Sequence, residues 1–345
     1  MTKNHRKIAG VIGTGSFGTA LTMLLSKNAE VWLYGRNAEL IDQVKRTREH
    51  FGVILPENVH LTSHVEEVAR RCRVIFPVVP SANFRQMMRQ LGPYLSPKHI
   101  LIHGTKGFDV TGLPDEVPLK PEHVHTMSQV IRQESAVVRI GCLSGPNLAS
   151  EILEGQPTAT VIASRFLEVT EAGKRLLSSK FFQVFGTFEI LGAELAGALK
   201  NTIAIGAGIL AGLGLGKNIQ ALLITRGLNE MIYLGKAIGA SPKAFLGTAG
   251  IGDLVCTATS EKSRNFTFGK RLGQGELPMH IMDTMPELAE GVRTLKIVWH
   301  LSKYYQLNMP INQMLYRVVF EGYPIDKAIE FLMRYPYYVD VDFLD

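Results

Sequence analysis

The sequence predicts an α/β protein in two parts: a doubly wound sheet of parallel strands, followed by an all-α C-terminal domain. In the first half of the chain, short apolar runs alternate with helical segments, as is typical of such a sheet. A glycine-rich turn follows the first apolar run. From about Leu191 the strand-like runs give way to long helical segments. This change of pattern predicts a domain boundary, with one domain over 1–190 and a second over 191–345.

Buried strands are predicted where four to six apolar residues are bounded by turn residues. In chain order these runs are Ile8–Ile12, Glu30–Tyr34, Val74–Val79, Ile100–His103, Ile140–Leu143, Thr158–Ala163 and Phe182–Phe185. Helices are predicted at Thr19–Ser26, Glu39–Arg48, Phe84–Leu91, Leu148–Leu153, Leu191–Leu210, Ala221–Ile238, Met285–Tyr304 and Asn312–Phe320. The segment from Leu191 to Ile205 is apolar nearly all round, so we expect a buried central helix there. The proline-rich stretch Val110–His125 is predicted to be a loop.

The glycine-rich turn reads Gly13-Thr14-Gly15-Ser16-Phe17-Gly18 and lies between a predicted strand and a predicted helix. Gly13 permits a tight turn, Gly15 lets the backbone approach a pyrophosphate, and Gly18 lets the helix pack closely on the strand. The helix N-terminus offers unpaired N–H groups to phosphates. The pattern therefore predicts a Rossmann-type dinucleotide site. A structural glycine turn or a methyltransferase-like nucleotide loop are the alternatives.

The end of the second strand indicates which dinucleotide is preferred. An acidic residue normally binds the NAD ribose there, but Glu30–Tyr34 is followed by Gly35 and Arg36. A guanidinium suits the 2′-phosphate of NADP, so the sequence favours NADP, with NAD also accepted. In the alternative interpretation Arg36 is a solvated surface charge and Glu39 contacts the ribose.

Composition limits the class of protein. A chain of 345 residues that is 46% hydrophobic and 20% charged forms a large globular core. The net charge of +6 comes from scattered basic residues, which argues against nucleic-acid binding and suits an anionic small substrate and cofactor.

Three widely spaced cysteines, which we expect to be buried, suit a reducing cytoplasm. No metal site is expected, since His123 and His125 lack a nearby third ligand. The apolar stretches are too short for export or membrane insertion.

Lys200 is an ionisable residue in a segment that otherwise suits burial. Burial disfavours the cation and lowers a lysine pKa, which makes the side chain a usable proton donor and acceptor near neutral pH. The alternative is a surface lysine whose stem covers the core. Lys106 follows a predicted strand, where its charge could meet a substrate or be an ordinary loop charge.

Three further motifs offer polar groups. Gly145-Pro146-Asn147 follows a strand, with Pro146 expected in the first helical turn and backbone N–H groups facing a ligand; a plain helix start is the alternative. Gly250-Ile251-Gly252-Asp253 is either part of a site or a glycine turn in which Asp253 caps a helix. Ser263-Arg264-Asn265 supplies a hydroxyl, a guanidinium and an amide suited to a phosphate, or is a polar loop.

Together these motifs, with Thr225-Arg226-Gly227-Leu228 and Glu290-Gly291, resemble the bacterial-type NAD(P)-dependent glycerol-3-phosphate dehydrogenase family over nearly the whole chain. The resemblance implies reversible hydride transfer between sn-glycerol 3-phosphate and dihydroxyacetone phosphate, supplying phospholipid synthesis, in a cytoplasmic homodimer. It implies that Lys200 is the catalytic proton acceptor. The implied substrate contacts are Lys106, Gly145, Asn147, Asp253, Ser263, Arg264 and Asn265. The implied cofactor contacts are Gly13, Gly15, Ser16, Phe17, Gly18, Arg36, Lys106, Ala149, Arg264, Leu288 and Glu290.

Two departures from the family pattern and two rival functions stay open. Asn147 replaces the usual Thr or Ser, and Val110–His125 interrupts a segment that the family more often makes helical. A related dehydrogenase of a 2-keto or 3-hydroxy acid would also use Arg264, to bind a carboxylate. A non-enzymatic NADP-binding sensor is the other rival, although it has no need of a proton relay through Lys200 and Asp253.

Overall fold

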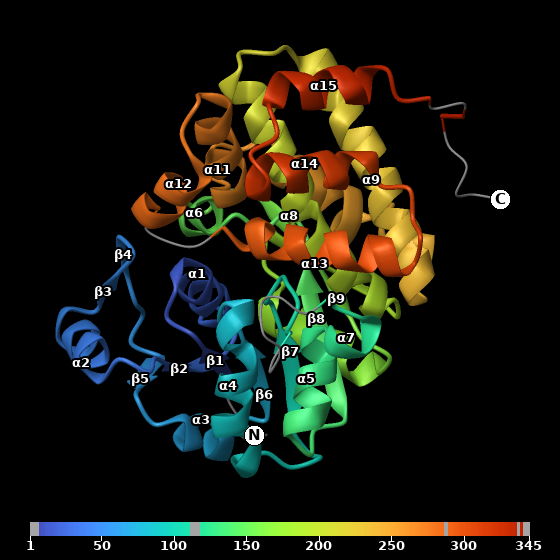
Figure 1. Ribbon diagram of the computed structural model, residues 1–345. Coiled ribbons are helices and arrows are strands. Elements are labelled where there is room, and N and C mark those ends of the chain that lie inside the picture. Colours follow the sequence, from blue (N-terminus) through green and yellow to red (C-terminus); the bar gives the residue numbers. More distant parts are fainter. Residues whose placement is uncertain (1–6, 111–117, 286–288, 337–338, 341–345) are drawn as a thin grey trace, which may run out of the picture. The chain divides into compact units, whose positions relative to one another are not determined.

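The computed structural model describes residues 7–110, 118–285, 289–336 and 339–340. The chain divides into two compact units. The first unit comprises Met1–Asp109 and Thr126–Ile190, and the second comprises Val110–His125 and Leu191–Asp345. The predicted fold class is confirmed: the first unit contains a doubly wound sheet, and the regular elements described in the second are helical (Figure 1).

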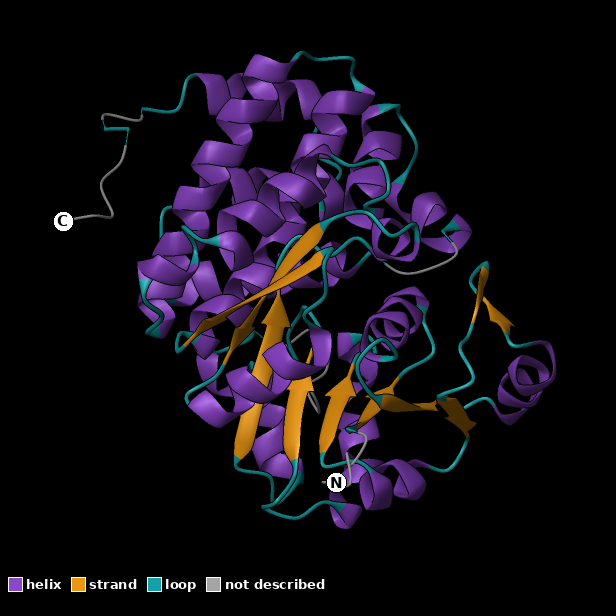
Figure 2. Ribbon diagram, turned by 180° about the vertical axis from the view of Figure 1, so that it is seen from behind, coloured by secondary structure: helices purple, strands orange, loops and turns teal. Residues whose placement is uncertain are grey.

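The sheet of the first unit has eight strands in the order β10-β9-β8-β7-β6-β1-β2-β5. Neighbours are parallel except β8 and β9, which pair antiparallel. The order from β5 to β8 is that of a dinucleotide-binding sheet, and its switch point lies between β1 and β6. The strands, drawn in orange in Figure 2, are β1 (Ile8–Ile12), β2 (Glu30–Tyr34), β5 (Val59–Thr62), β6 (Val74–Pro77), β7 (Ile100–His103), β8 (Arg139–Ser144), β9 (Thr158–Ala163) and β10 (Phe182–Thr187). A separate hairpin pairs β3 (Glu49–His50) with β4 (Val53–Ile54).

Helices cover both faces of this sheet. One group of helices that contact one another contains α1, α6 and α7, and another contains α3, α4 and α5. Ile12, Leu33 and Phe76 are fully buried between these layers. Burial of each such side chain stabilises the fold by about 1.5–3 kcal/mol. The helices are α1 (Ser16–Leu25), α2 (Ala38–Thr47), α3 (Val65–Arg71), α4 (Ser81–Leu91), α5 (Met127–Glu134), α6 (Ala149–Leu153) and α7 (Leu167–Leu177).

The second unit is built around α8, the predicted central helix. Its helices are α8 (Ile190–Gly212), α9 (Lys217–Ile238), α10 (Asp253–Thr259), α11 (Arg264–Gly273), α12 (Pro278–Thr284), α13 (Glu290–Tyr304), α14 (Pro310–Phe320) and α15 (Ile325–Met333). Within the described part of the chain, α8 is the one helix long and apolar enough to cross a membrane. Its most apolar window is 89% buried, as in the core helix of a globular unit.

Close packing of α8 on α11 depends on glycines from both helices. A Cβ atom added at Gly208 would lie 2.1 Å from the carbonyl oxygen of Phe266, and one at Gly269 would lie 1.9 Å from that of Ile205. The two backbones therefore approach each other directly. This approach brings the start of α11, with the predicted site residues Arg264 and Asn265, beside the middle of α8.

Three local predictions were wrong. Met285 lies outside a helix, and α13 begins at Glu290. Pro146 precedes α6, which begins at Ala149 because Leu148 has an extended backbone. The alternative in which Asp253 caps α10 is excluded, because Asp253 is the first residue of that helix and the backbone is already helical at Gly252. Cys72 and Cys142 are buried as expected, whereas Cys256 is half-buried.

Candidate functional site

The glycine turn of the first unit has the geometry that a diphosphate requires. Gly13 has a φ of 124° and donates its N–H to the Tyr34 carbonyl oxygen at 3.0 Å. A Cβ atom at Gly18 would lie 2.0 Å from the Gly13 carbonyl oxygen, so only glycine fits there. Gly15 precedes α1 without a capping side chain, and a Cβ atom there would meet nothing within 4 Å. The first N–H groups of α1, from Ser16 onward, have no acceptor within the helix, so this turn fits a dinucleotide.

Arg36 and Glu39 both lie just beyond the carboxyl end of β2, and both are exposed. Asn37 separates them and caps α2, because its Oδ1 accepts the Leu40 N–H at 3.0 Å. The cap fixes the start of α2. It thereby fixes the backbone positions from which the Arg36 and Glu39 side chains extend. Both charged side chains reach solvent beyond the carboxyl end of β2, where sheets of this type bind the cofactor ribose.

Lys106 and Gly145 are brought together at neighbouring strand ends. The loop that follows β7 is fixed by Thr105, whose hydroxyl donates to the Val79 carbonyl oxygen at 2.7 Å. The half-buried Lys106 donates from Nζ to the Gly145 carbonyl oxygen at 3.0 Å. This bond holds the lysine side chain at the carboxyl ends of the strands, where its positive charge can attract an anion.

The Asn147 side chain connects its loop to β9. Its Nδ2 donates to the Ala159 carbonyl oxygen at 3.1 Å, and its Oδ1 accepts the Thr160 hydroxyl at 2.8 Å. Each end of the amide is thus engaged once within the first unit. Ala149, the predicted cofactor contact, follows as the first residue of α6.

The second unit contains a buried lysine–carboxylate pair. Lys200 is 4% exposed, which decides against the surface alternative. Its Nζ donates to Asp253 Oδ1 and to the Thr257 hydroxyl oxygen, the latter at 2.6 Å. Thr257 in turn donates to the Asp253 main-chain carbonyl oxygen at 2.7 Å. Sequence reasoning missed Thr257, although it lies one helical turn after Asp253 and so on the same face of α10.

A π-helical turn over Thr248–Gly252 aims Asp253 at the lysine. A Cβ atom at Gly250 would lie 2.1 Å from the Phe245 carbonyl oxygen, so this turn depends on glycine. Such π-turns are frequent at functional sites. The glycine turn, for which a purely structural role was the alternative, therefore positions the Asp253 carboxylate.

A second polar cluster connects α8, α11 and α13. Asn265 Nδ2 donates to Asn201 Oδ1 at 3.0 Å, and Asn265 Oδ1 accepts the Gly291 N–H at 2.8 Å. Asn201 directly follows Lys200, so the cluster continues from the lysine pair along α8. Sequence reasoning missed the roles of Asn201 and Gly291, because each bonds Asn265 across 64 and 26 positions of the chain respectively.

The N-terminus of α11 presents Ser263 and Arg264. Ser263 is buried and caps the helix, accepting the Phe266 N–H at 3.3 Å. Arg264 is exposed and is the first residue of α11. A guanidinium at a helix N-terminus is suited to an anion, because charge and unpaired N–H groups act together. Glu290 begins α13, while Leu288 lies outside the described residues.

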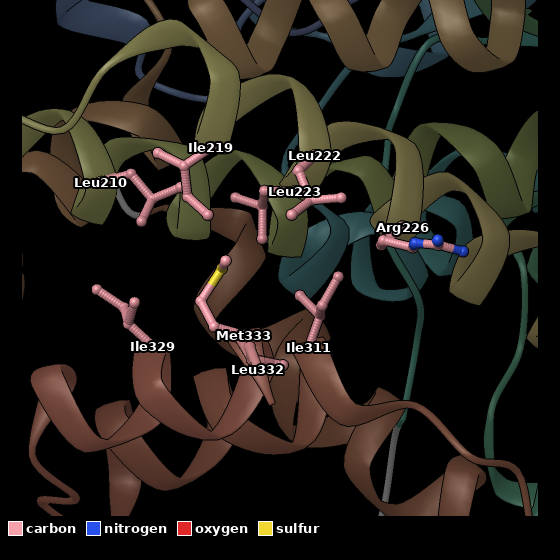
Figure 3. Close-up of a pocket in the computed structure, with 9 residues that line it drawn as sticks. All are labelled: Leu210, Ile219, Leu222, Leu223, Arg226, Ile311, Ile329, Leu332 and Met333. Atoms are coloured by element: carbon pink, nitrogen blue, oxygen red, sulfur yellow. The ribbon is translucent and has the colours of Figure 1, made fainter. Parts of the chain in front are cut away.

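An apolar cavity of about 50 Å³ lies elsewhere in the second unit (Figure 3). Among its described lining residues Arg226 alone is charged, and Figure 3 shows its guanidinium away from the aliphatic side chains. Arg226 donates instead to the Val339 and Asp340 carbonyl oxygens. The described lining residues therefore provide no group of hydrogen-bond donors that could bind a phosphate. The other lining residues are Leu210, Ile219, Leu222, Leu223, Ile311, Ile329, Leu332 and Met333.

Sequence comparison assigns the chain to a family. The family described as NAD-dependent glycerol-3-phosphate dehydrogenase matches through its N-terminal region at residues 7–170 and through its C-terminal region at residues 189–330. The glycerol-3-phosphate dehydrogenase [NAD(P)+] of Geobacter metallireducens is 40% identical, with 94% of this chain and 96% of that protein covered. The chain belongs to the NAD-dependent glycerol-3-phosphate dehydrogenase family. The enzyme of that name from Teredinibacter turnerae is 37% identical, with 98% of both chains covered.

Structural comparison agrees with the family assignment. The glycerol-3-phosphate dehydrogenase of Coxiella burnetii has a TM-score of 0.86 at 29% identity, with 96% of this chain and 99% of that chain covered. A ketopantoate reductase from Ralstonia eutropha has a TM-score of 0.56 at 12% identity, with 93% and 99% covered. The second likeness is one of fold alone. The predicted family is thus confirmed over nearly the whole chain.

Proposed function

We propose that this chain interconverts sn-glycerol 3-phosphate and dihydroxyacetone phosphate with NADP(H) or NAD(H). The observation that carries the proposal is the buried Lys200–Asp253 pair in a chain of this dehydrogenase family. Two buried charges are costly unless each is compensated, so such a pair needs a reason beyond stability. Proton transfer at a substrate hydroxyl is that reason. A ketoacid reductase and a non-enzymatic sensor are the weaker interpretations.

Lys200 moves the proton in the proposed reaction. During oxidation the neutral amine of Lys200 accepts the proton of the C2 hydroxyl and becomes the ammonium form, and during reduction the ammonium form returns that proton to the C2 oxygen. Asp253 and Thr257 orient Nζ, since both hydrogen-bond to it. The bound nicotinamide accepts or supplies the hydride. The chain's own contribution is therefore orientation and proton transfer.

The substrate phosphate is assigned to Arg264, with Ser263 and Asn265 beside it. Arg264 supplies a two-pronged charged donor, and the first turn of α11 supplies N–H groups. In the first unit Lys106 contacts both substrate and cofactor. The remaining proposed substrate contacts are Gly145, Asn147 and Asp253.

The dinucleotide is assigned to the glycine turn and to residues after neighbouring strands. The open space at Gly15 and the uncapped start of α1 support this assignment. The proposed contacts are Gly13, Gly15, Ser16, Phe17, Gly18, Arg36, Lys106, Ala149, Arg264, Leu288 and Glu290. We further assign the enzyme to the cytoplasm as a homodimer that supplies glycerol 3-phosphate for phospholipid synthesis.

The proposal is tested by following NADPH absorbance after dihydroxyacetone phosphate is added to the purified enzyme. Rapid oxidation of NADPH is expected with this substrate, and little or none with 2-keto acids or without substrate. Equal rates with a 2-keto acid would favour the ketoacid reductase instead. Cofactor binding without turnover of any ketone would favour the sensor.

Arg36→Asp should weaken NADPH binding far more than NADH binding. An aspartate at this position repels the 2′-phosphate and can accept a hydrogen bond from the NAD ribose. The Kd for NADPH should therefore rise far more than the Kd for NADH, and fluorescence titration with each cofactor measures both. Arg46→Asp, at an exposed position on α2, is the matched control because it changes the net charge equally. An unchanged ratio of the two Kd values in Arg36→Asp would assign the ribose contact elsewhere, with Glu39 the next candidate.

A further inference from the structure

The loop that carries Lys106 is fixed at its start by the neighbouring strand. Gly104 donates its N–H to the Pro77 carbonyl oxygen at 3.0 Å, and the Thr105 hydroxyl bonds the Val79 carbonyl oxygen. Both acceptors lie at the end of β6 or just after it. Nothing in these contacts fixes the side of the loop that follows Lys106. That side ends at Asp109, three positions further along the chain.

Asp109 is bound by an arginine from a helix that covers the sheet. Its carboxylate is 2% exposed and accepts Arg85 Nε at 2.8 Å. Arg85 lies on α4 and is 8% exposed. The same guanidinium donates to Glu134 at 2.5 Å and to Gln133 at 2.7 Å, both at the end of α5. One side chain thus connects α4, α5 and the loop after β7.

The arginine is well suited to hold a loop. Burial opposes the charge of Arg85, but its hydrogen bonds to Asp109 and Glu134 outweigh burial and hold the pKa of Arg85 above its usual value. The planar guanidinium has five donors in a fixed geometry, so it holds its three acceptors in a defined arrangement, whereas the ammonium group of a lysine imposes no such plane. Arg85 therefore stays charged and immobile, and Asp109 is fixed with it.

We propose that Arg85 is a positioning residue: through Asp109 it fixes the loop from Gly104 to Asp109 so that Lys106 is presented to its anionic ligands. The inference rests on the proposed function in one respect, the role assigned to Lys106. Neither Arg85 nor Asp109 has any assigned contact with substrate or cofactor. Their effect reaches the reaction only through the position of Lys106.

Asp109→Asn tests the proposal, because it removes the charge that holds the loop while Glu134 still compensates Arg85. A displacement of about 1 Å in a binding group can cost about 10²-fold in rate. We expect kcat/KM for dihydroxyacetone phosphate to fall by about tenfold or more, mainly through KM, because Lys106 binds rather than reacts. The matched control is Glu134→Gln, which removes the other carboxylate from the same guanidinium. It should stay within about threefold of the parent enzyme, because the loop keeps its bond to Arg85.

A double variant separates positioning from general stability. If Asp109 acts through Lys106, Asp109→Asn should change kcat/KM by less than about twofold when Lys106→Met is already present. Hydrogen exchange of the backbone amides from Gly104 to Asp109 gives a readout that needs no activity. Exchange there should become faster in Asp109→Asn and stay unchanged in Glu134→Gln. If Asp109→Asn fails to fold, Arg85→Lys replaces it as the test variant, because lysine keeps the positive charge but lacks the planar, two-pronged donor geometry of the guanidinium.

Equal losses of kcat/KM in Asp109→Asn and Glu134→Gln would overturn the proposal, as would a full effect of Asp109→Asn in the Lys106→Met background. Unchanged exchange of the loop would overturn it independently. Full activity of Lys106→Met would contradict the role of Lys106 in the proposed function, and the exchange result would still decide whether Arg85 fixes the loop.

Discussion

Lys200→Met should abolish turnover while leaving NADPH binding nearly intact. Methionine matches the length of lysine but carries no proton, and general acid–base groups contribute about 10²- to 10⁴-fold in rate. We expect kcat to fall by at least about a hundredfold. Steady-state kinetics with dihydroxyacetone phosphate measures this loss, and fluorescence titration measures NADPH binding.

The structure shows which control this experiment needs. Removing the lysine leaves the buried Asp253 carboxylate without its cation, and breaking such a pair costs about 3–5 kcal/mol. The double variant Lys200→Met/Asp253→Asn removes both charges and should recover much of the lost stability in a thermal melt, yet remain inactive. If either folded variant kept a kcat within about threefold of the parent, Lys200 would have no part in proton transfer.

Arg264→Ala should distinguish the phosphorylated substrate from its unphosphorylated analogue. Hydrogen bonds to charged groups contribute about 1.5–3 kcal/mol each, and a guanidinium can bind phosphate through two of them. We expect kcat/KM for dihydroxyacetone phosphate to fall by about ten- to a hundredfold or more, with a much smaller effect on dihydroxyacetone. Parallel kinetics with the two ketones measures the contrast.

Arg271→Ala is the matched control for this prediction, because it removes the same charge from the same helix. Arg271 pairs with the partly exposed Glu276, and such surface pairs contribute little to stability. Its kinetics should stay close to those of the parent enzyme. Equal losses for both ketones in Arg264→Ala would mean that Arg264 acts on the cofactor or on the fold. A parent enzyme without any preference for the phosphorylated ketone would contradict the function itself.

Most of the sheet could be predicted from the sequence, because each strand is a short apolar run bounded by turn residues. β5 (Val59–Thr62) was not predicted, because only two of its four residues, Val59 and Leu61, are apolar. The start of α13 was placed too early, since an apolar pattern does not show where the backbone becomes helical. Lys106 and Gly145 could be predicted singly, from their positions after strands. That Lys106 bonds the Gly145 carbonyl could not.

The buried charged residues show most clearly that contacts between distant parts of the chain could not be predicted from the sequence. The sequence could not decide between a buried and a surface Lys200, because burial depends on helices that pack over it from distant parts of the chain. Its partner Asp253 lies 53 residues further along. The sequence does not indicate a role for Arg85 or Asp109, because a lone arginine on a helix and an aspartate in a loop have no distinctive pattern.

The alternation of strands and helices, the glycine turn and the family to which the chain belongs could therefore be derived from the amino-acid sequence. These features are local or carried by motifs in a fixed order, so neighbouring residues are enough to specify them. Which polar groups meet depends instead on how the elements pack: Lys200 with Asp253 and Thr257, Asn201 with Asn265, and Arg85 with Asp109. A buried charge is stable only when a partner reaches it with the right geometry. That partner comes from another element, and its position exists only once the helices have packed.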